Sequence, residues 1–355
     1  MTLIYNGCMS RNVKNPFFYI LVIGLLLWQV LESIQLPLPG FPYEDMGIPL
    51  DTRTVTGKGV GVVFMDLFPM ERLAHLPQKP VSEWKRLKNI EDFRLPGDPV
   101  DHGTHVSGIV KRIAPEATLH HLSITADPYD VAYFMKRPDI DVINVSAYIT
   151  GEWVVREFVE GLNQGKILVL AGGNDGVNLS TLHTHNRWIL DHIAAINPTL
   201  LEQVVIAINL NRAPKKVLSH LYHTFDSYSH EGSYRLHPSS NYPGFLFQEL
   251  ALAAPGVDIE SDLADGRIAK MTGTSMAAPV ISGAIALLME AYDQSHPKPS
   301  GLSDGVQNKR QRTRVTAACL RATATKSQDH EPLNPQIFGS GILNVPGALA
   351  CVKSQ

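Results

Sequence analysis

The stretch from residue 273 to residue 288 constrains the fold of this chain more than any other part of the sequence. It reads GTSMAAP followed by VISGAIALL, so that small residues are interleaved with large apolar ones. The large side chains fall on all sides of a 3.6-residue period rather than along one stripe. This pattern predicts a helix that is buried all round and packed closely against its neighbours.

Ser275 lies in the first turn of this predicted helix. The first backbone N–H groups of a helix have no acceptor within it, and they lie at the positive end of its dipole. Both effects stabilise negative charge on an oxygen, so we predict that Ser275 is a nucleophile. Pro279 follows about one turn into the helix, where a missing N–H costs little.

Three other stretches carry residue types that complete such a site. An apolar run at 60–65 ends in Asp66, and its uniform apolarity predicts a buried parallel strand. The motif DHGTHVSG places His102 on a glycine-bracketed turn that leads into a helix. A second buried strand, at 167–170, runs into AGGNDG, which contains Asn174.

The order Asp66, His102, Asn174 and Ser275 resembles that of the subtilisin-like serine peptidases, the subtilases, over roughly residues 45–355. The resemblance implies a three-layer α/β fold with a mostly parallel central sheet and helices on both faces. It also implies that Ser275 attacks a peptide carbonyl, that His102 is the general base and that Asp66 orients His102. The amide of Asn174 and the backbone N–H of Ser275 would form the oxyanion hole. Hydrolysis would pass through an acyl-enzyme without a metal or an organic cofactor.

Two other functions stay open at this point. The family usually continues after the aspartate with a hydroxyl residue and glycine, whereas Leu67 and Phe68 stand here. This departure permits a catalytically silent binding protein with the subtilase fold. The same triad would also serve an esterase or an amidase. Because all four catalytic residue types are present, we favour a peptidase that acts on proteins or peptides.

Four residues form the predicted substrate-binding set. In relatives, a Gly-rich edge that follows the strand at 141–146 flanks the substrate side chain before the scissile bond. Ser146 ends this strand, and Tyr148 stands in the edge that follows. A tyrosine would narrow the pocket, so we expect a preference for small or slender side chains. Gly172 and Gly173 complete the set, because glycine lets the backbone approach a ligand closely.

We expect no metal site. Many secreted relatives have a calcium-binding loop between the segments equivalent to 106–112 and 113–119, but these two run almost directly into each other here. His183 and His185 stand two residues apart, but no other motif with metal-ligand spacing supports them. A solvated loop is the better interpretation of these histidines.

The N-terminal 35 residues are predicted to lie outside the globular domain. Residues 17–31 read FFYILVIGLLLWQVL, and Arg11 and Lys14 precede them. This run fits the apolar part of a secretory signal, although no typical cleavage site follows, so an uncleaved membrane anchor or a buried core helix is also considered. Residues 36–44 would be a Pro-rich spacer, and 45–355 the catalytic domain, secreted or anchored outside the cytoplasm.

The composition of the chain limits the kinds of partner that it could bind. The chain has 355 residues, of which 44% are hydrophobic, and its net charge is −3 without any basic block. These values predict one large domain and give no support to nucleic-acid binding. The three cysteines make no metal cluster; Cys319 and Cys351 either pair or are two buried thiols. The polar stretch 295–312 is predicted to be an exposed loop, followed by a helix at 315–322.

Overall fold

The computed structural model describes residues 54–67, 100–124, 126, 128–149, 151–212, 234–297, 305–328 and 331–355. The predictions for the signal or anchor at 1–35, for the spacer at 36–44 and for the beginning of the catalytic domain lie outside these residues.

A seven-stranded sheet forms the centre of the fold. Its strand order is β2-β1-β3-β4-β5-β6, and β7 also pairs with β5. All pairs are parallel except that between β5 and β6. The strands are β1 (Gly61–Asp66), β2 (Thr118–Ser123), β3 (Val142–Val145), β4 (Ile167–Ala171), β5 (Val204–Arg212), β6 (Tyr234–Leu236) and β7 (Ala251–Pro255). Because both faces are covered, β1, β3 and β4 are buried along almost their whole length and are mostly apolar rather than alternating.

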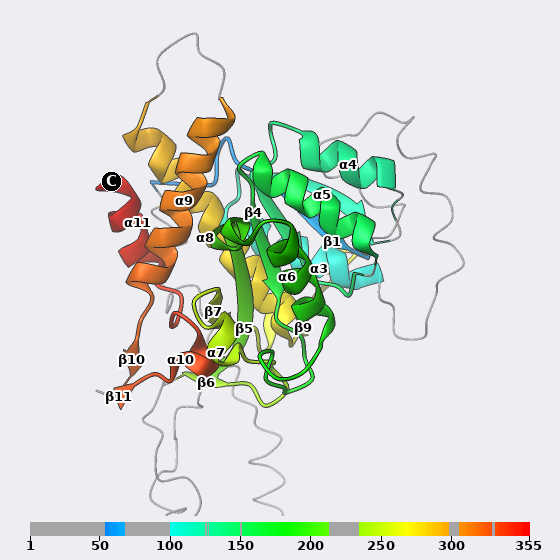
Figure 1. Ribbon diagram of the computed structural model, residues 1–355, viewed down its shortest axis with the longest axis vertical. Helices are drawn as coiled ribbons and strands as arrows, with labels where there is room; N and C mark the ends of the chain where they lie inside the picture. The colour runs from blue at the N-terminus through cyan, green and yellow to red at the C-terminus, as the bar shows by residue number, and fades with distance from the viewer. Residues whose placement is uncertain are drawn as a thin grey trace, which may run out of the picture. The chain divides into compact units, whose positions relative to one another are not determined.

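Helices cover both faces of this sheet (Figure 1). One face carries α4 (Pro128–Lys136), α5 (Glu152–Asn163) and α6 (His185–Ile196), and the other carries α3 (Val100–Ile113) and α8 (Thr274–Ser295). Two further helices, α9 (Val306–Thr323) and α11 (Val345–Lys353), pack against α8. The predicted three-layer α/β fold is therefore confirmed.

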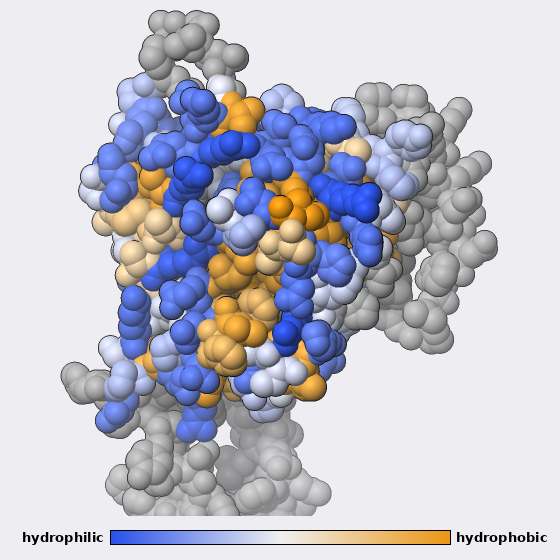
Figure 2. Space-filling view, in the orientation of Figure 1, coloured by the Kyte–Doolittle hydropathy of each residue, from blue (hydrophilic) through white to orange (hydrophobic). Residues whose placement is uncertain are grey.

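Short elements complete the described chain. They are η3 (Pro198–Gln203), α7 (Gly244–Phe247), α10 (Pro335–Phe338) and the hairpins β8 (Ile259–Asp262)–β9 (Ile268–Met271) and β10 (Ser327–Gln328)–β11 (Glu331–Pro332). Figure 2 shows apolar surface over α7, where the side chains of Phe245 and Leu246 are 61% and 50% exposed.

The helix predicted from the 273–288 stretch is α8, and it is buried all round. Nearly all of its residues up to Ala291 are inaccessible to solvent. A Cβ at Gly283 would come within 2.8 Å of the side chain of Ile113, so glycine there lets α3 approach closely. By length and composition α8 is the one described helix that could span a membrane, but 94% of its apolar window is buried inside the domain. It is therefore a core helix.

A carboxylate near the end of α8 holds the segment that leads into β1. The side chain of Glu290 is buried, and its Oε2 accepts hydrogen bonds from the backbone N–H groups of Thr56, Gly57 and Lys58 at 2.5, 2.7 and 3.2 Å. Hydrogen bonds to an ionised acceptor are stronger than neutral ones. This contact fixes the point at which β1 enters the sheet.

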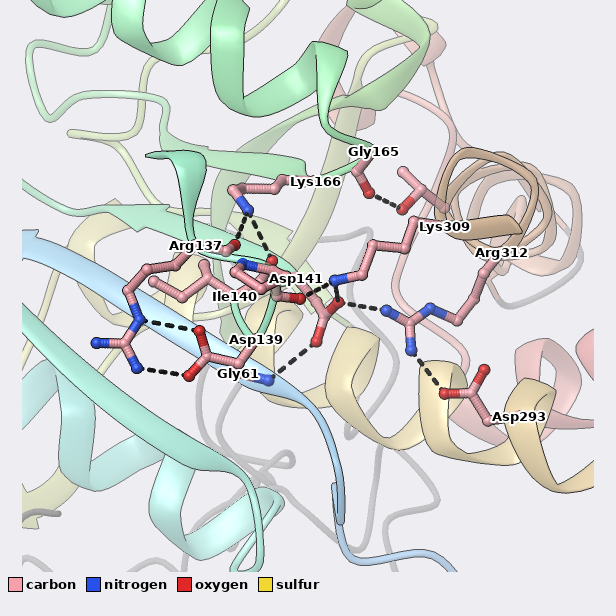
Figure 3. Close-up of polar contacts among 12 residues, drawn as sticks. Gly61, Arg137, Asp139, Ile140, Asp141, Gly165, Lys166, Asp293, Lys309 and Arg312 are labelled. Carbon is pink, nitrogen blue, oxygen red and sulfur yellow. Dashed lines mark hydrogen bonds and ion pairs between the residues drawn. The ribbon is translucent and has the colours of Figure 1, made fainter. Parts of the chain in front are cut away.

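The amino-terminal edge of the sheet carries a buried cluster of charges (Figure 3). The carboxylate of Asp141, 3% exposed, accepts hydrogen bonds from Lys309 at 3.1 Å, from Arg312, and from the backbone N–H of Gly61 at 3.1 Å. Arg312 also pairs with Asp293 at 2.6 Å. These contacts tie α9 to β1 and β3.

The prediction of an exposed loop at 295–312 is therefore wrong for residues 306–312. They begin α9, and the side chains of Lys309 and Arg312 are buried because Asp141 compensates their charge.

Lys166 lies in the same cluster, and in the described part of the chain its amino group contacts carbonyl oxygens rather than a carboxylate. Its Nζ donates to the carbonyls of Arg137 and Ile140 at 2.6 and 2.9 Å. Burial, followed by the charge of Lys309, lowers the pKa of Lys166 to about 8.

The two cysteines whose state the sequence left open form a disulfide, Cys319–Cys351, which joins α9 to α11. The loop that it closes has a sequence separation of 32 residues. A crosslink of this span stabilises a domain by about 3–4 kcal/mol if its effect is to restrict the unfolded chain.

We predict that replacing both cysteines by serine lowers the free energy of unfolding by about 3–4 kcal/mol. The measurement is urea unfolding with and without a reductant. Reductant should lower the unfolding midpoint of the wild-type protein and leave that of the Cys319→Ser/Cys351→Ser variant unchanged. A wild-type midpoint that does not respond to complete reduction would contradict the prediction.

Candidate active site

Three of the predicted site residues lie at one edge of the sheet, where parallel strands end. Asp66 is the last residue of β1, Ser146 follows β3, and Asn174 follows β4. The register pairs the penultimate residue of β1 with the last residue of β3, so Asp66 and Ser146 lie on neighbouring strands at the same level. The carboxyl edge of such a sheet is the place where α/β proteins bind ligands.

Asp66 and His102 are in direct contact. The Nδ1 of His102, in the first turn of α3, lies 2.7 Å from Oδ1 of Asp66, whose side chain is 1% exposed. The helix begins at Val100, so the sequence prediction placed its start several residues late. The backbone N–H of Leu67 also donates to Oδ1 at 2.7 Å. The family usually has a hydroxyl residue where Leu67 stands. This difference therefore does not move the carboxylate of Asp66 out of contact with the imidazole.

The environment of His102 raises its pKa. Burial alone would lower the pKa, but the charge of Asp66 and the hydrogen bond that His102 donates to it outweigh burial. Because Nδ1 carries the hydrogen that Asp66 accepts, Nε2 is the nitrogen that can take up a proton. His105, by contrast, is fully buried, and burial lowers its pKa; its Nε2 lies 3.1 Å from the carbonyl of Ala269. Its burial and this contact indicate a structural rather than a reacting histidine.

Ser275 is the second residue of α8, and its hydroxyl donates to the carbonyl of Ser146 at 3.0 Å. In the described part of the chain this carbonyl, and not the imidazole of His102, is the partner of the hydroxyl. The backbone N–H of Ser275 has no acceptor within the helix, since it belongs to the first turn. The structure thus brings Asp66 and His102 together as one pair, and Ser275 and Ser146 as another.

A chain of buried hydrogen bonds holds Ser275 against β3. Pro279 has no N–H to give to the carbonyl of Ser275, and the hydroxyl of Ser146 donates to that carbonyl at 3.1 Å instead. Asn144 donates to the Ser146 hydroxyl at 2.9 Å and accepts from the hydroxyl of Ser282, also at 2.9 Å. The sequence motifs predicted a role for neither Asn144 nor Ser282, although each is a polar residue within an apolar run.

The side chain of Asn174 is oriented by the residue before Ser275. Its Oδ1 accepts from the backbone N–H of Thr274 at 2.9 Å and from the Thr274 hydroxyl at 3.1 Å. Because a backbone N–H can only donate, the amide oxygen must face Thr274 and the NH₂ group must face away. A Cβ at Gly273 would lie 3.1 Å from Nδ2. No described residue accepts a hydrogen bond from this NH₂ group.

The predicted substrate-binding glycines are crowded by the protein itself. A Cβ at Gly172 would lie 2.8 Å from the carbonyl oxygen of Ala207, and one at Gly173 would lie 2.3 Å from Nδ2 of Asn241. Gly173 also has φ +100°, a backbone conformation that residues with a side chain rarely adopt. These glycines are therefore required for the folding of the loop, whatever their part in binding.

Tyr148 follows β3 and is 57% exposed. Partial burial raises its pKa, and so does the negative charge of Asp175 in the loop after β4. Tyr148 thus follows Ser146 closely at the carboxyl end of β3, within electrostatic reach of Asp175.

The site contains a hydroxyl in the first turn of a buried helix, and an imidazole in contact with a buried carboxylate. Serine hydrolases use groups of these kinds. Sequence comparison narrows this class. The Subtilase family matches residues 77–341, and the chain belongs to this family.

Relatives and solved structures agree with this assignment. Subtilisin E of Bacillus subtilis (strain 168) is 27% identical over 270 residues, which are 71% of this chain and 56% of that protein. The C5a peptidase of Streptococcus pyogenes is 32% identical over 100 residues, so the match spans 28% of this chain and only 8% of that protein. The prenylagaramide maturation protease PagA has the same fold, with a TM-score of 0.55 and 19% identity over 89% of this chain and 99% of its own.

We predict that Asp66→Asn lowers the pKa of His102 relative to the wild-type protein, because the change removes the charge that raises it. NMR titration of the imidazole should give a wild-type midpoint above the ordinary value of 6.5 and a lower midpoint in the variant. A raised pKa stabilises the folded state at pH values below the unfolded pKa, and this contribution is lost as the pH rises through the folded pKa. The stability difference between the two proteins should therefore shrink as the pH rises above about 6.5. Identical midpoints would contradict the prediction.

Proposed function

We propose that this chain is a serine endopeptidase in which Ser275 is the nucleophile, His102 the general base and Asp66 the residue that orients His102. The observation that carries the proposal is the 2.7 Å contact between the buried carboxylate of Asp66 and Nδ1 of His102. A binding protein without catalysis has no need of a buried carboxylate that raises the basicity of a partly exposed imidazole. Family membership supports peptides or proteins as the substrates.

In the proposed reaction the hydroxyl of Ser275 first leaves the carbonyl of Ser146 and turns to Nε2 of His102. Catalytic hydrogen bonds often form only when substrate is bound, so the Ser146 contact is compatible with this step. The oxygen attacks the peptide carbonyl while its proton passes to Nε2. The negative oxygen that results lies between the backbone N–H of Ser275 and Nδ2 of Asn174.

The intermediate collapses when the peptide C–N bond breaks and the proton on Nε2 of His102 passes to the leaving amine. An ester between Ser275 and the acyl half of the substrate remains. A water molecule then gives a proton to His102 and attacks this ester, which releases the acid and returns the proton to Ser275. These steps use only side chains and backbone groups of this chain, together with water.

A location outside the cytoplasm is part of the proposal. The Cys319–Cys351 disulfide supports it, because disulfides persist in oxidising compartments. The apolar run at 17–31 would serve as the export signal or as a membrane anchor.

The proposal predicts that a fluorophosphonate probe labels the wild-type protein and that Ser275→Ala abolishes both labelling and peptide hydrolysis. Ser295→Ala is the matched control, because Ser295 carries a hydroxyl at the other end of the same helix. A folded wild-type protein that takes up no label would establish the silent binding protein instead. Turnover of ester or small amide substrates without turnover of peptides would establish the esterase or amidase.

We also predict a preference for small or slender side chains before the scissile bond, because Tyr148 stands in the segment after β3 where relatives have a Gly-rich edge. Tyr148→Gly should raise kcat/KM for peptides with bulky residues at that position by about tenfold or more relative to those with alanine. Tyr129→Gly, at an exposed tyrosine of α4, is the control and should leave the profile unchanged. A wild-type cleavage profile dominated by aromatic residues would contradict this prediction.

A further inference from the structure

A buried asparagine far along the sequence holds the loop that carries Asn174. The side chain of Asn241 is 1% exposed, and its Oδ1 accepts hydrogen bonds from the backbone N–H groups of Asp175 and Val177, both at 3.0 Å. Its Nδ2 donates to the carbonyl of Gly172 at 3.0 Å and to the carboxylate of Asp175 at 3.2 Å. Both hydrogens and both lone pairs of the amide are therefore used within one loop.

Backbone contacts close the loop around this side chain. The N–H of Asn241 donates to the carbonyl of Gly173 at 2.9 Å, and the N–H of Gly176 donates to the carbonyl of Ser239 at 2.8 Å. With the contacts of the side chain, they bind the loop on both sides of Asn174. The loop has no regular secondary structure of its own, so its conformation depends on these partners.

Asn241 is itself anchored to the central sheet. The neighbouring Ser240, fully buried, donates its hydroxyl hydrogen to the carbonyl of Asn241 at 3.0 Å and accepts from the backbone N–H of Asn209 in β5 at 2.9 Å. The carbonyl of Asn209 accepts from the N–H of His237 at 3.0 Å. The position of the loop is thus fixed by a strand of the central sheet rather than by another loop.

We propose that Asn241 is a positioning residue for the oxyanion hole, an inference that rests on the proposed function. Thr274 sets the direction in which the Asn174 amide points, and Asn241 sets where the backbone of Asn174 lies. Asn241 has its four bonds inside the protein and none left for substrate. Its loss should therefore weaken the stabilisation of the transition state while leaving substrate binding nearly unchanged.

A double-mutant cycle tests this inference. Asn241→Ala should lower kcat by about 10- to 100-fold, since a displacement on the order of 1 Å can cost 10²-fold, and should leave KM within about threefold. Asn174→Ala should lower kcat by about 10²–10³-fold, a magnitude taken from the oxyanion asparagine of subtilisin, a member of this family. If Asn241 acts through Asn174, adding Asn241→Ala to Asn174→Ala should change kcat by less than about twofold.

Two further variants separate positioning from general stability. Asn344→Ala is the matched control: Asn344 caps α11, with hydrogen bonds to Gly347 and Thr323, and its loss should lower stability without changing kcat. Asn241→Asp keeps the acceptors but sets a carboxylate against that of Asp175. Adding Asp175→Asn should restore a donor–acceptor pair and recover part of the lost kcat, whereas a general loss of stability would not be rescued in this way.

The outcomes distinguish two failures. Turnover that does not depend on Ser275 in the wild-type protein overturns the proposed function and this inference with it. Turnover that depends on Ser275, together with losses at Asn174 and Asn241 that multiply in the double variant, overturns this inference alone. The positioning role is likewise overturned by itself if Asn241→Ala folds and keeps its kcat, or if Asn344→Ala lowers kcat equally.

Discussion

The burial of α8 is the constraint on which the rest of the structure depends. A helix that is covered on all sides must satisfy each of its polar groups with protein partners, because water cannot reach them. The hydroxyl of Ser282 finds Asn144, the carbonyl that Pro279 leaves unpaired finds Ser146, and the carboxylate of Glu290 finds three backbone N–H groups. These partners join the helix to β3 and to the segment before β1, and so set where Ser275 lies.

The two edges of the sheet serve different purposes. At the amino-terminal edge, Asp141 gathers Lys309 and Arg312 and ties α9 to the strands. At the carboxyl edge, the carboxylate of Asp66 contacts the imidazole of His102. The same kind of buried carboxylate is thus paired with lysine and arginine at one edge and with an imidazole at the other. Of these side chains, histidine has the ordinary pKa that lies nearest neutrality.

The sequence alone was sufficient to predict those elements whose structure is determined by neighbouring residues. The apolar pattern of α8 and the strand that ends in Asp66 could both be read from contiguous residues, whereas His102 was expected on a turn and lies inside α3. Lys309 and Arg312 were misread because their partner, Asp141, lies far away in sequence and polar residues are usually solvated. The pairing of Cys319 with Cys351 depends on how α9 meets α11. Asn241 could not be recognised, since its role consists of hydrogen bonds to a loop that precedes it by more than sixty residues.

The central claim is that Asp66, His102, Asn174 and Ser275 converge on one reacting oxygen. The most direct measurement is a crystal structure of the wild-type protein after reaction with a peptidyl phosphonate. The account predicts a covalent bond from phosphorus to Oγ of Ser275 and a phosphonyl oxygen about 3 Å from both Nδ2 of Asn174 and the Ser275 N–H. It also predicts that Asp66 still contacts His102. An unmodified Ser275 in a folded protein, or a phosphonyl oxygen turned away from Asn174, would contradict it.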